Sequence, residues 1–411
     1  MVPAWEGFWK PIREAPEADA PRLIFADWLE EAGDTGRAEF IRVQLALAKL
    51  PPHDRRRPEL ANAERRLLSR YSEEWARPYA GLATGPVFRR GFVEEVKVTA
   101  RQFLAQAPAL FRAGPLRHLH LLDVGSHLRA VLHSPHLAKL TGLTVYGQHL
   151  GPDLARALGD SPHLEGLRKL IVARNEIGDE GVEHLVLNPG LASLEELDLS
   201  ENDIGQVGAR LLARCPRFGN LTHLQLAGNG IGPLGAETIA ASAAIPNMSD
   251  FGLKGTRLGG PRSEMIETSK LLRVARLDFT GNALTATSLR PILETTDPAM
   301  IRELDLGHND LGDAGAELLA TAPTLGDLRV LRLTGNGIGD DGLRALASSQ
   351  TLRRLTQLDV GNNPVGDDGV QAILDSPAFK TLRYFVCPAI GLSFRMRLAL
   401  HTQYSQMHPS G

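Results

Sequence analysis

The amino-acid sequence predicts an α/β solenoid with a small α-helical segment at its N-terminus. Two observations predict it: a pattern of leucines and an asparagine that recurs at a nearly fixed interval, and a purely helical pattern that precedes it. The recurring stretch is best preserved as LEELDLSENDIG, from Leu194 to Gly205. Self-similarity at a period of roughly 20–50 residues indicates stacked structural repeats. We therefore expect one extended body rather than several globular domains.

The copies of this stretch follow one another at steps of 26 or 27 residues. Where the chain leaves each predicted strand, backbone groups turn away from water, and an asparagine side chain offers both a donor and an acceptor to satisfy them. Thr256 takes the place of the asparagine once. We expect the asparagines to form a structural ladder from coil to coil, made of Asn175, Asn202, Asn229, Asn282, Asn309, Asn336 and Asn363.

Each repeat is expected to hold one strand and one helix. Side chains alternate along a strand, so Leu197 and Leu199 are predicted to enter the core while their neighbours face outward. The motif Ile-Gly-Asp-x-Gly then begins a helix in several repeats. We expect its aspartates to cap the helices that they begin, namely Asp179, Asp313, Asp340 and Asp367.

A 27-residue unit of this kind resembles the ribonuclease-inhibitor-like class of leucine-rich repeats. The resemblance implies a curved parallel sheet on the concave side and helices on the convex side. Leucine-rich repeats are expected over residues 140–380, where Gln148 holds the first asparagine position. Atypical first coils and an N-terminal cap are expected over 83–139, and a C-terminal cap over 381–411, because the ends of a solenoid must seal exposed apolar surface.

Residues 1–82 lack the period and are expected to form helices that pack on one another. The run DAPRLIFADWLEEAGDTGRAEFIRVQLALAKL, from Asp19 to Leu50, resembles the repeat-companion domain at the N-terminus of many bacterial repeat proteins. The resemblance implies a bacterial protein with downstream repeats, and no established activity. Trp28 is expected to fill a helix seam, and Asp27 or Asp34 to cap or pair locally; a binding site at Asp27 and Trp28 is the alternative.

Composition excludes several broad classes. The chain is 43% hydrophobic and 23% charged with a formal net charge of -3, so it has no uniform field that would favour nucleic acid or a membrane. The arginines between Arg55 and Arg70 alternate with glutamates and suit a solvated helix face. Cys215 and Cys387 lie too far apart in the sequence to suggest a disulfide framework. We expect a cytoplasmic protein without a membrane partner, and a monomer.

The sequence lacks the motifs of a reaction centre. It contains no phosphate-binding loop, no Gly-x-Ser-x-Gly and no Cys/His ligand spacing, so we expect no enzyme and no cofactor. A zinc site remains an alternative, with His118 and His120 on one strand face and His149 or Asp123 as a further ligand. A row of aspartates in equivalent strand positions is expected to be surface polarity rather than a metal site.

The outward strand positions are therefore the predicted site. They mix charged and small residues, which suits recognition of a protein partner on the concave face better than recognition of a polyanion. Two alternatives stay open: a regulator of a nucleotide-hydrolysing enzyme, similar to GTPase-activating proteins, and a metal-dependent enzyme that uses the histidine-rich first coils. The predicted contact residues are Lys169, Glu196, Asp198, His223, Gln225, Arg276, Asp278, Glu303, Asp305, Arg332, Gln357 and Asp359.

Overall fold

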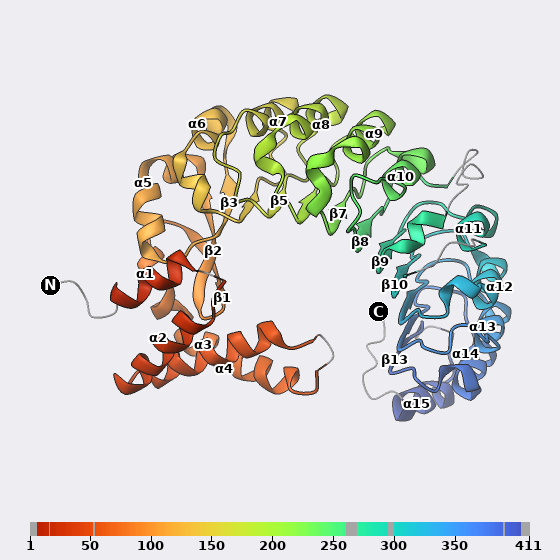
Figure 1. The fold of residues 1–411 in the computed structure, drawn as a ribbon. Coiled ribbons are helices and arrows are strands. Elements are labelled where there is room, and N and C mark those ends of the chain that lie inside the picture. The colour runs from red at the N-terminus through yellow and green to blue at the C-terminus, as the bar shows by residue number, and fades with distance from the viewer. Residues whose placement is uncertain are drawn as a thin grey trace. The chain divides into compact units, whose positions relative to one another are not determined.

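The computed structural model describes residues 6–15, 17–51, 54–259, 269–294, 300–388 and 391–403. These residues form an α/β fold in which helices alternate with thirteen strands, most of them parallel (Figure 1). The chain divides into two compact units. Unit 1 comprises Met1–Gln148 and Asp160–Ile171, and unit 2 comprises His149–Gly159 and Val172–Gly411.

Unit 1 begins with four helices, as the sequence predicts. Gly33, with φ of +89°, lies just after the second of them, in a backbone conformation that favours glycine. Asp34 accepts a hydrogen bond from the backbone N–H of Arg37 at 3.0 Å, which confirms its predicted role as a cap. The helices are α1 (Glu6–Glu14), α2 (Ala20–Glu31), α3 (Thr35–Lys49) and α4 (Arg57–Ala76), followed by the 3-10 helix η1 (Arg77–Tyr79).

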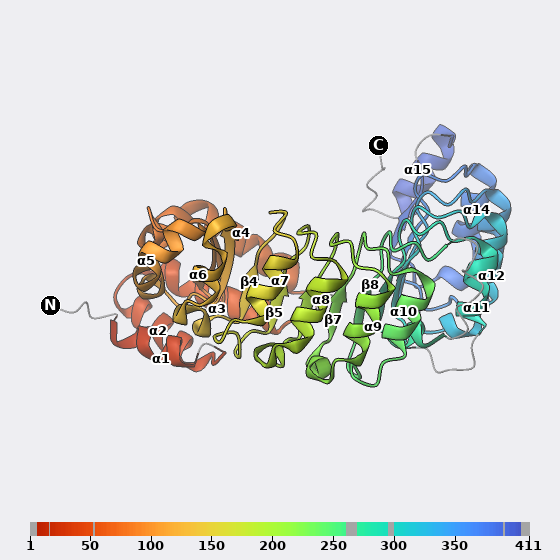
Figure 2. The same ribbon diagram turned by 90° about the horizontal axis from the view of Figure 1, so that it is seen from above.

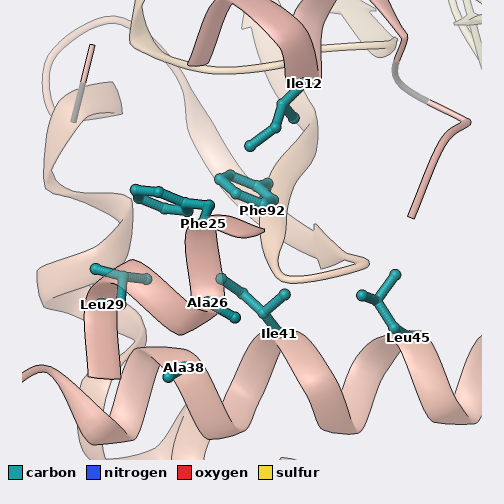
Figure 3. Packing of buried hydrophobic residues seen from close by; sticks show 8 residues of the cluster. All are labelled: Ile12, Phe25, Ala26, Leu29, Ala38, Ile41, Leu45 and Phe92. Carbon is teal, nitrogen blue, oxygen red and sulfur yellow. The ribbon is translucent and has the colours of Figure 1, made fainter. Parts of the chain in front are cut away.

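The core of unit 1 joins these helices to the first strands. Figure 3 shows the rings of Phe25 and Phe92 beside one another, near Ile12 and Ile41, with Phe92 contributed by a strand. Trp28 packs 5.3 Å from Phe8 and 5.8 Å from Phe25 between ring centroids. Trp28 therefore fills a seam between helices, as predicted.

An antiparallel hairpin that the sequence pattern did not predict follows the helices. Its strands β1 (Thr84–Arg89) and β2 (Phe92–Thr99) pair around Gly91, where an added Cβ would lie 2.4 Å from Ile41 Cγ1 of α3. Parallel strands then continue the sheet of unit 1. The remaining elements are α5 (Ala100–Ala113), β3 (His118–Leu122), η2 (Gly125–His127), α6 (Leu128–Leu132), η3 (Pro135–Lys139), β4 (Gly142–Thr144) and β5 (Lys169–Ile171).

Buried polar side chains fasten the helices to this hairpin. Arg22 of α2 donates to the carbonyl of Arg90 at 3.0 Å and forms an ion pair with Glu94 of β2. Gln44 of α3 donates to the carbonyl of Phe88 at 3.2 Å and accepts from the N–H of Gly91 at 2.6 Å. The helical segment and the first strands of unit 1 therefore share one interior.

Unit 2 repeats a strand, a turn and a helix, with consecutive strands paired in parallel and in register. The strands are β6 (Glu196–Asp198), β7 (His223–Gln225), β8 (Asp250–Gly252), β9 (Arg276–Asp278), β10 (Glu303–Asp305), β11 (Val330–Arg332), β12 (Gln357–Asp359) and β13 (Tyr384–Val386). The middle residue of each strand joins one apolar column from Leu197 to Phe385, and none of the eight is more than 2% exposed.

The helices of unit 2 follow one another along a single side of its strands (Figures 1 and 2). They are α7 (Pro152–Gly159), α8 (Gly178–Leu187), α9 (Gln206–Arg214), α10 (Gly232–Ala240), α11 (Ala286–Leu293), α12 (Gly312–Thr321), α13 (Asp340–Ala347), α14 (Asp367–Asp375) and α15 (Phe394–Gln403). Shorter 3-10 helices precede several strands: η4 (Pro189–Leu191), η5 (Pro216–Asn220), η7 (Ser269–Arg273), η8 (Pro323–Leu325) and η9 (Pro377–Phe379). Within the described residues, no helix is both long and apolar enough to cross a membrane.

The recurring asparagines bind the backbone of two neighbouring coils. Asn202 Oδ1 accepts from the backbone N–H of Asn175 at 3.0 Å, and its Nδ2 donates to the carbonyls of Val172 and Leu199, each at 3.0 Å. Asn229, Asn282 and Asn363 repeat this arrangement. The geometry shows why a side chain with both a donor and an acceptor recurs at this position.

The aspartates of the Ile-Gly-Asp-x-Gly motif act differently from the prediction. Asp179 lies inside α8 and makes no cap to that helix; its Oδ1 accepts from the N–H groups of Gly205 and Gly208, at 2.7 and 2.8 Å, at the start of α9. Asp313 likewise caps α13. Asp340 and Asp367 accept from the backbone at the starts of α14 and α15. The prediction that each aspartate caps its own helix is therefore wrong, because sequence proximity cannot show contacts between coils.

Candidate partner-binding face

The side of the unit 2 strands opposite the helices carries the predicted contact residues. Strand side chains alternate, so the residues on either side of the buried middle column point away from the helices. We call this surface the open face and define it by Glu196, Asp198, His223, Gln225, Asp250, Arg276, Asp278, Glu303, Asp305, Arg332, Gln357, Asp359 and Tyr384. Arg276 and Tyr384 are exposed and the others are half-buried. Lys169, also a predicted contact, lies on β5 of unit 1.

The aspartates at the last position of their strands share one local geometry. Oδ1 of Asp278 accepts from the N–H of Thr280 at 2.8 Å, and Oδ1 of Asp305 from that of Gly307 at 3.0 Å. Asp198 and Asp359 make the same bond two residues along the chain, each at 2.9 Å. One oxygen of each carboxylate thus stabilises the turn after the strand and fixes the direction of the other.

Asp250 connects two predicted contact residues of the open face. It accepts from Gln225 Nε2 at 3.1 Å and pairs with Arg276 Nε at 3.1 Å. Gln225 lies across the next strand, where a Cβ added to Gly252 would fall 1.6 Å from Gln225 Oε1. Gln225 is therefore held in place rather than freely extended. Sequence reasoning placed Asp250 on this surface but did not select it, although it occupies the same strand position as Glu196 and Glu303.

The C-terminal half of the open face mixes both charges. Asp305 Oδ1 also accepts from Thr280 Oγ1 at 3.1 Å, and Arg332 Nη1 lies 4.0 Å from Asp305 Oδ2. Glu303 and Gln357 flank Val330 in the register, and Val330 is only 5% exposed. The surface therefore offers separated charges beside a small apolar step, an arrangement typical of protein recognition.

The histidines of unit 1 form pairs instead of a ligand set. His120 Nε2 lies 2.6 Å from Glu95 Oε1, and His118 Nε2 lies 2.8 Å from Thr144 Oγ1, with the two imidazole rings stacked at 4.8 Å. Burial lowers the pKa of His118 to about 4, and the nearby His120 and Lys169 lower it further, against the opposing effect of Glu95. His118 is thus neutral at physiological pH.

The zinc site considered from the sequence is not assembled by these contacts. His149 pairs with Glu176 at 2.6 Å within unit 2, and Asp123 lies in a left-handed turn of unit 1 with φ of +50°. Across the part of the chain that the structure describes, no group of three His, Cys, Asp or Glu side chains is arranged to hold a metal ion.

Comparison with protein families agrees with the architecture. A family model described as "Leucine Rich repeat" matches residues 166–186, 190–213, 220–240, 298–320, 327–347 and 351–374. This chain carries leucine-rich repeats. Each matched segment contains one strand of the solenoid or the turns around it, whereas the coils of β8 and β9 lie between the third and fourth matched segments. No curated protein sequence matches the chain.

Several solved structures are similar to this leucine-rich-repeat chain. The crystal structure of yeast Rad7 and Elc1 matches with a TM-score of 0.48 and 14% identity, covering 91% of this chain and 80% of the other. An internalin (inlF) from Listeria monocytogenes gives 0.40 and 14%, covering 76% and 85%. The TLR13–ssRNA13 complex gives 0.44 and 17%, covering 69% of this chain, which spans only 37% of that one.

Proposed function

We propose that this protein is a non-enzymatic, cytoplasmic and monomeric interaction module that binds a protein partner on the open face of unit 2. The observation that carries the proposal is the fixed geometry of its strand-end aspartates. Asp198, Asp278 and Asp359 each use one oxygen for the following turn, and make no other hydrogen bond or ion pair with the described residues. The second oxygen is therefore an oriented acceptor that costs little further ordering on binding.

The rigid backbone beneath these acceptors supports the same proposal. The strands are fixed by the apolar column and by the asparagines, so a partner meets a surface that is already formed. Arg276 and Arg332 add positive charge between the aspartates, which would select a partner of complementary pattern. Leucine-rich repeats supply the frame for such a surface, while the residues that the repeat leaves unspecified supply the selectivity.

The test removes charge and keeps the turns. In the variant Asp198→Asn/Asp278→Asn/Asp359→Asn, each amide oxygen still accepts the backbone N–H, so the fold is expected to stay intact. A partner is first captured from cells that express the protein and identified by mass spectrometry. Calorimetry with the purified partner is then expected to show about tenfold or greater loss of affinity.

A matched control carries three equivalent changes on the helices of unit 2. Asp153, Asp341 and Asp368 have side chains between 75% and 82% exposed, and their change to asparagine alters the net charge equally. The control is expected to bind as the parent does. Equal affinity of both variants would remove the open face as the site, and the identity of the partner decides whether it is a nucleotide-hydrolysing enzyme.

A further inference from the structure

The turns that lead into the last strands form a basic strip on one edge of unit 2. Within residues 323–329, 349–356 and 376–383, Asp327 is the one acidic residue. We call the cations of these turns, together with the one that precedes β10, the basic edge: Arg302, Arg329, Arg353, Arg354, Lys380 and Arg383. Arg302 and Arg354 have side chains 45% and 58% exposed, and the other four residues are also exposed. Six cations thus face solvent beside one carboxylate.

The other ends of the same strands lead to acidic turns. Asp310, Asp313, Asp340 and Asp367 lie there, and the last three are at the helix starts described above. Caps at helix N-termini explain this acidic edge, since carboxylates are favoured there. The two edges therefore carry opposite charge, which attracts an anionic partner to one edge and repels it from the other.

Half of the basic edge has a role in the fold. Asp327 pairs with Arg302 at 3.1 Å and also contacts Arg354, while Arg329 Nη1 donates to the carbonyl of Arg354 at 3.3 Å. These contacts join neighbouring coils, so their arginines are needed whether or not anything binds.

The other half has no such role. The Arg353 guanidinium bonds to Gln350 of its own turn, and the side chains of Lys380 and Arg383 make no hydrogen bond or ion pair among the described residues. None of the three holds one coil to the next. Their positive charge is consequently unexplained by the fold.

A hollow lies on the same edge. It has a volume of about 650 Å³ and lies between the turns that precede β11 and β12, where Asp327, Gln350, Arg353 and Arg354 line it. Thr324 and Thr351 also line it, but their hydroxyls are engaged by the carbonyls of Leu293 and Ala320. The accessible donors are therefore mainly cationic.

We propose that the basic edge binds an extended, acidic polypeptide segment of a partner protein. Guanidinium groups bind carboxylates with two parallel hydrogen bonds, and consecutive strands present their turns at about 4.8 Å steps. Alternate side chains of an extended peptide, about 6.6 Å apart, fall within reach of such long side chains. Phe379 is the one aromatic residue of these three turns and is buried, so the edge lacks a stacking platform for nucleic-acid bases.

The experiment uses the full chain and a fluorescein-labelled peptide of alternating glutamate and serine. Fluorescence anisotropy is expected to show binding that weakens several-fold when NaCl rises from about 50 to about 300 mM. The variant Arg353→Ala/Lys380→Ala/Arg383→Ala is expected to lose about tenfold in affinity. Its melting temperature should match that of the parent, because these side chains do not join coils.

A matched control removes the same charge elsewhere. Arg65, Arg66 and Arg70 are exposed on α4, and the variant Arg65→Ala/Arg66→Ala/Arg70→Ala is expected to bind the peptide as the parent does. An equal loss in this control, no binding by the parent, or tighter binding of a single-stranded thymidine oligonucleotide of equal charge would each overturn the proposal. The open-face asparagine variant should bind the peptide normally, which separates this proposal from the first.

Discussion

The two units of this protein bury polar side chains in different ways. In unit 2 the same asparagine returns in nearly every coil and joins backbone groups of adjacent coils. In unit 1 the buried pair Arg22 and Glu94 occurs once and joins residues 72 positions apart. A repeated polar residue is visible in the sequence because its period reveals it. A single buried pair has no such signal, although its contribution to stability is expected to be larger.

The largest expected effect therefore comes from breaking the pair of unit 1. Glu94→Leu leaves the fully buried Arg22 side chain without its carboxylate, and an uncompensated buried charge typically costs about 3–5 kcal/mol. All four tryptophans of the chain lie in the first 75 residues, so urea unfolding followed by tryptophan fluorescence reports on unit 1. We expect a marked fall in the urea midpoint.

Two further variants sharpen this result. Arg22→Met/Glu94→Leu is expected to recover much of the lost stability, because no isolated charge remains. Arg42→Met breaks an exposed cluster with Asp27 and Glu30 and should cost less than about 1 kcal/mol. If Glu94→Leu proves no more destabilising than Arg42→Met, the pair does not hold the helices to the hairpin.

A smaller effect is expected from one position of the asparagine column. Asn202→Ala removes an acceptor for the N–H of Asn175 and donors to two buried carbonyls, at a cost of about 2–3 kcal/mol. Asn336 offers a comparison within the column, since its Nδ2 donates to Leu306 and Leu333 but its buried Oδ1 has no hydrogen-bond partner among the described residues.

Asn336→Ala is therefore expected to be less destabilising than Asn202→Ala. Urea unfolding followed by circular dichroism measures both variants against the parent. Equal costs at the two positions would mean that the donors alone carry the stabilisation, and that the acceptor bond to the next coil contributes little.

Periodicity explains how much of the fold the sequence predicts. The leucine column, the strand and helix of each coil and the helical N-terminal segment all follow from spacing, because each repeat presents the same face to its neighbours. The hairpin of β1 and β2 was missed since it occurs once, and its strand pairing depends on docking against α3. Non-local contacts of this kind leave no local pattern.

The candidate site shows the same division. Alternation along the strands predicted which side chains lie on the open face, but not their partners. Asp250 links Gln225 to Arg276, and Asp305 accepts from Thr280 of the preceding coil. These contacts join coils, and they depend on side-chain conformations that spacing does not determine.

The smallest predicted effect tests the aspartates that were assigned to the wrong helix. Asp179→Ala removes the acceptor for the N–H groups of Gly205 and Gly208, and loss of a helix cap typically costs about 1 kcal/mol. Asp179→Asn keeps an acceptor oxygen and should cost less. Hydrogen exchange locates the damage: the first amides of α9 are expected to lose protection while those of α8 keep it. Loss of protection in α8 instead would restore the own-helix cap and contradict the contact between coils.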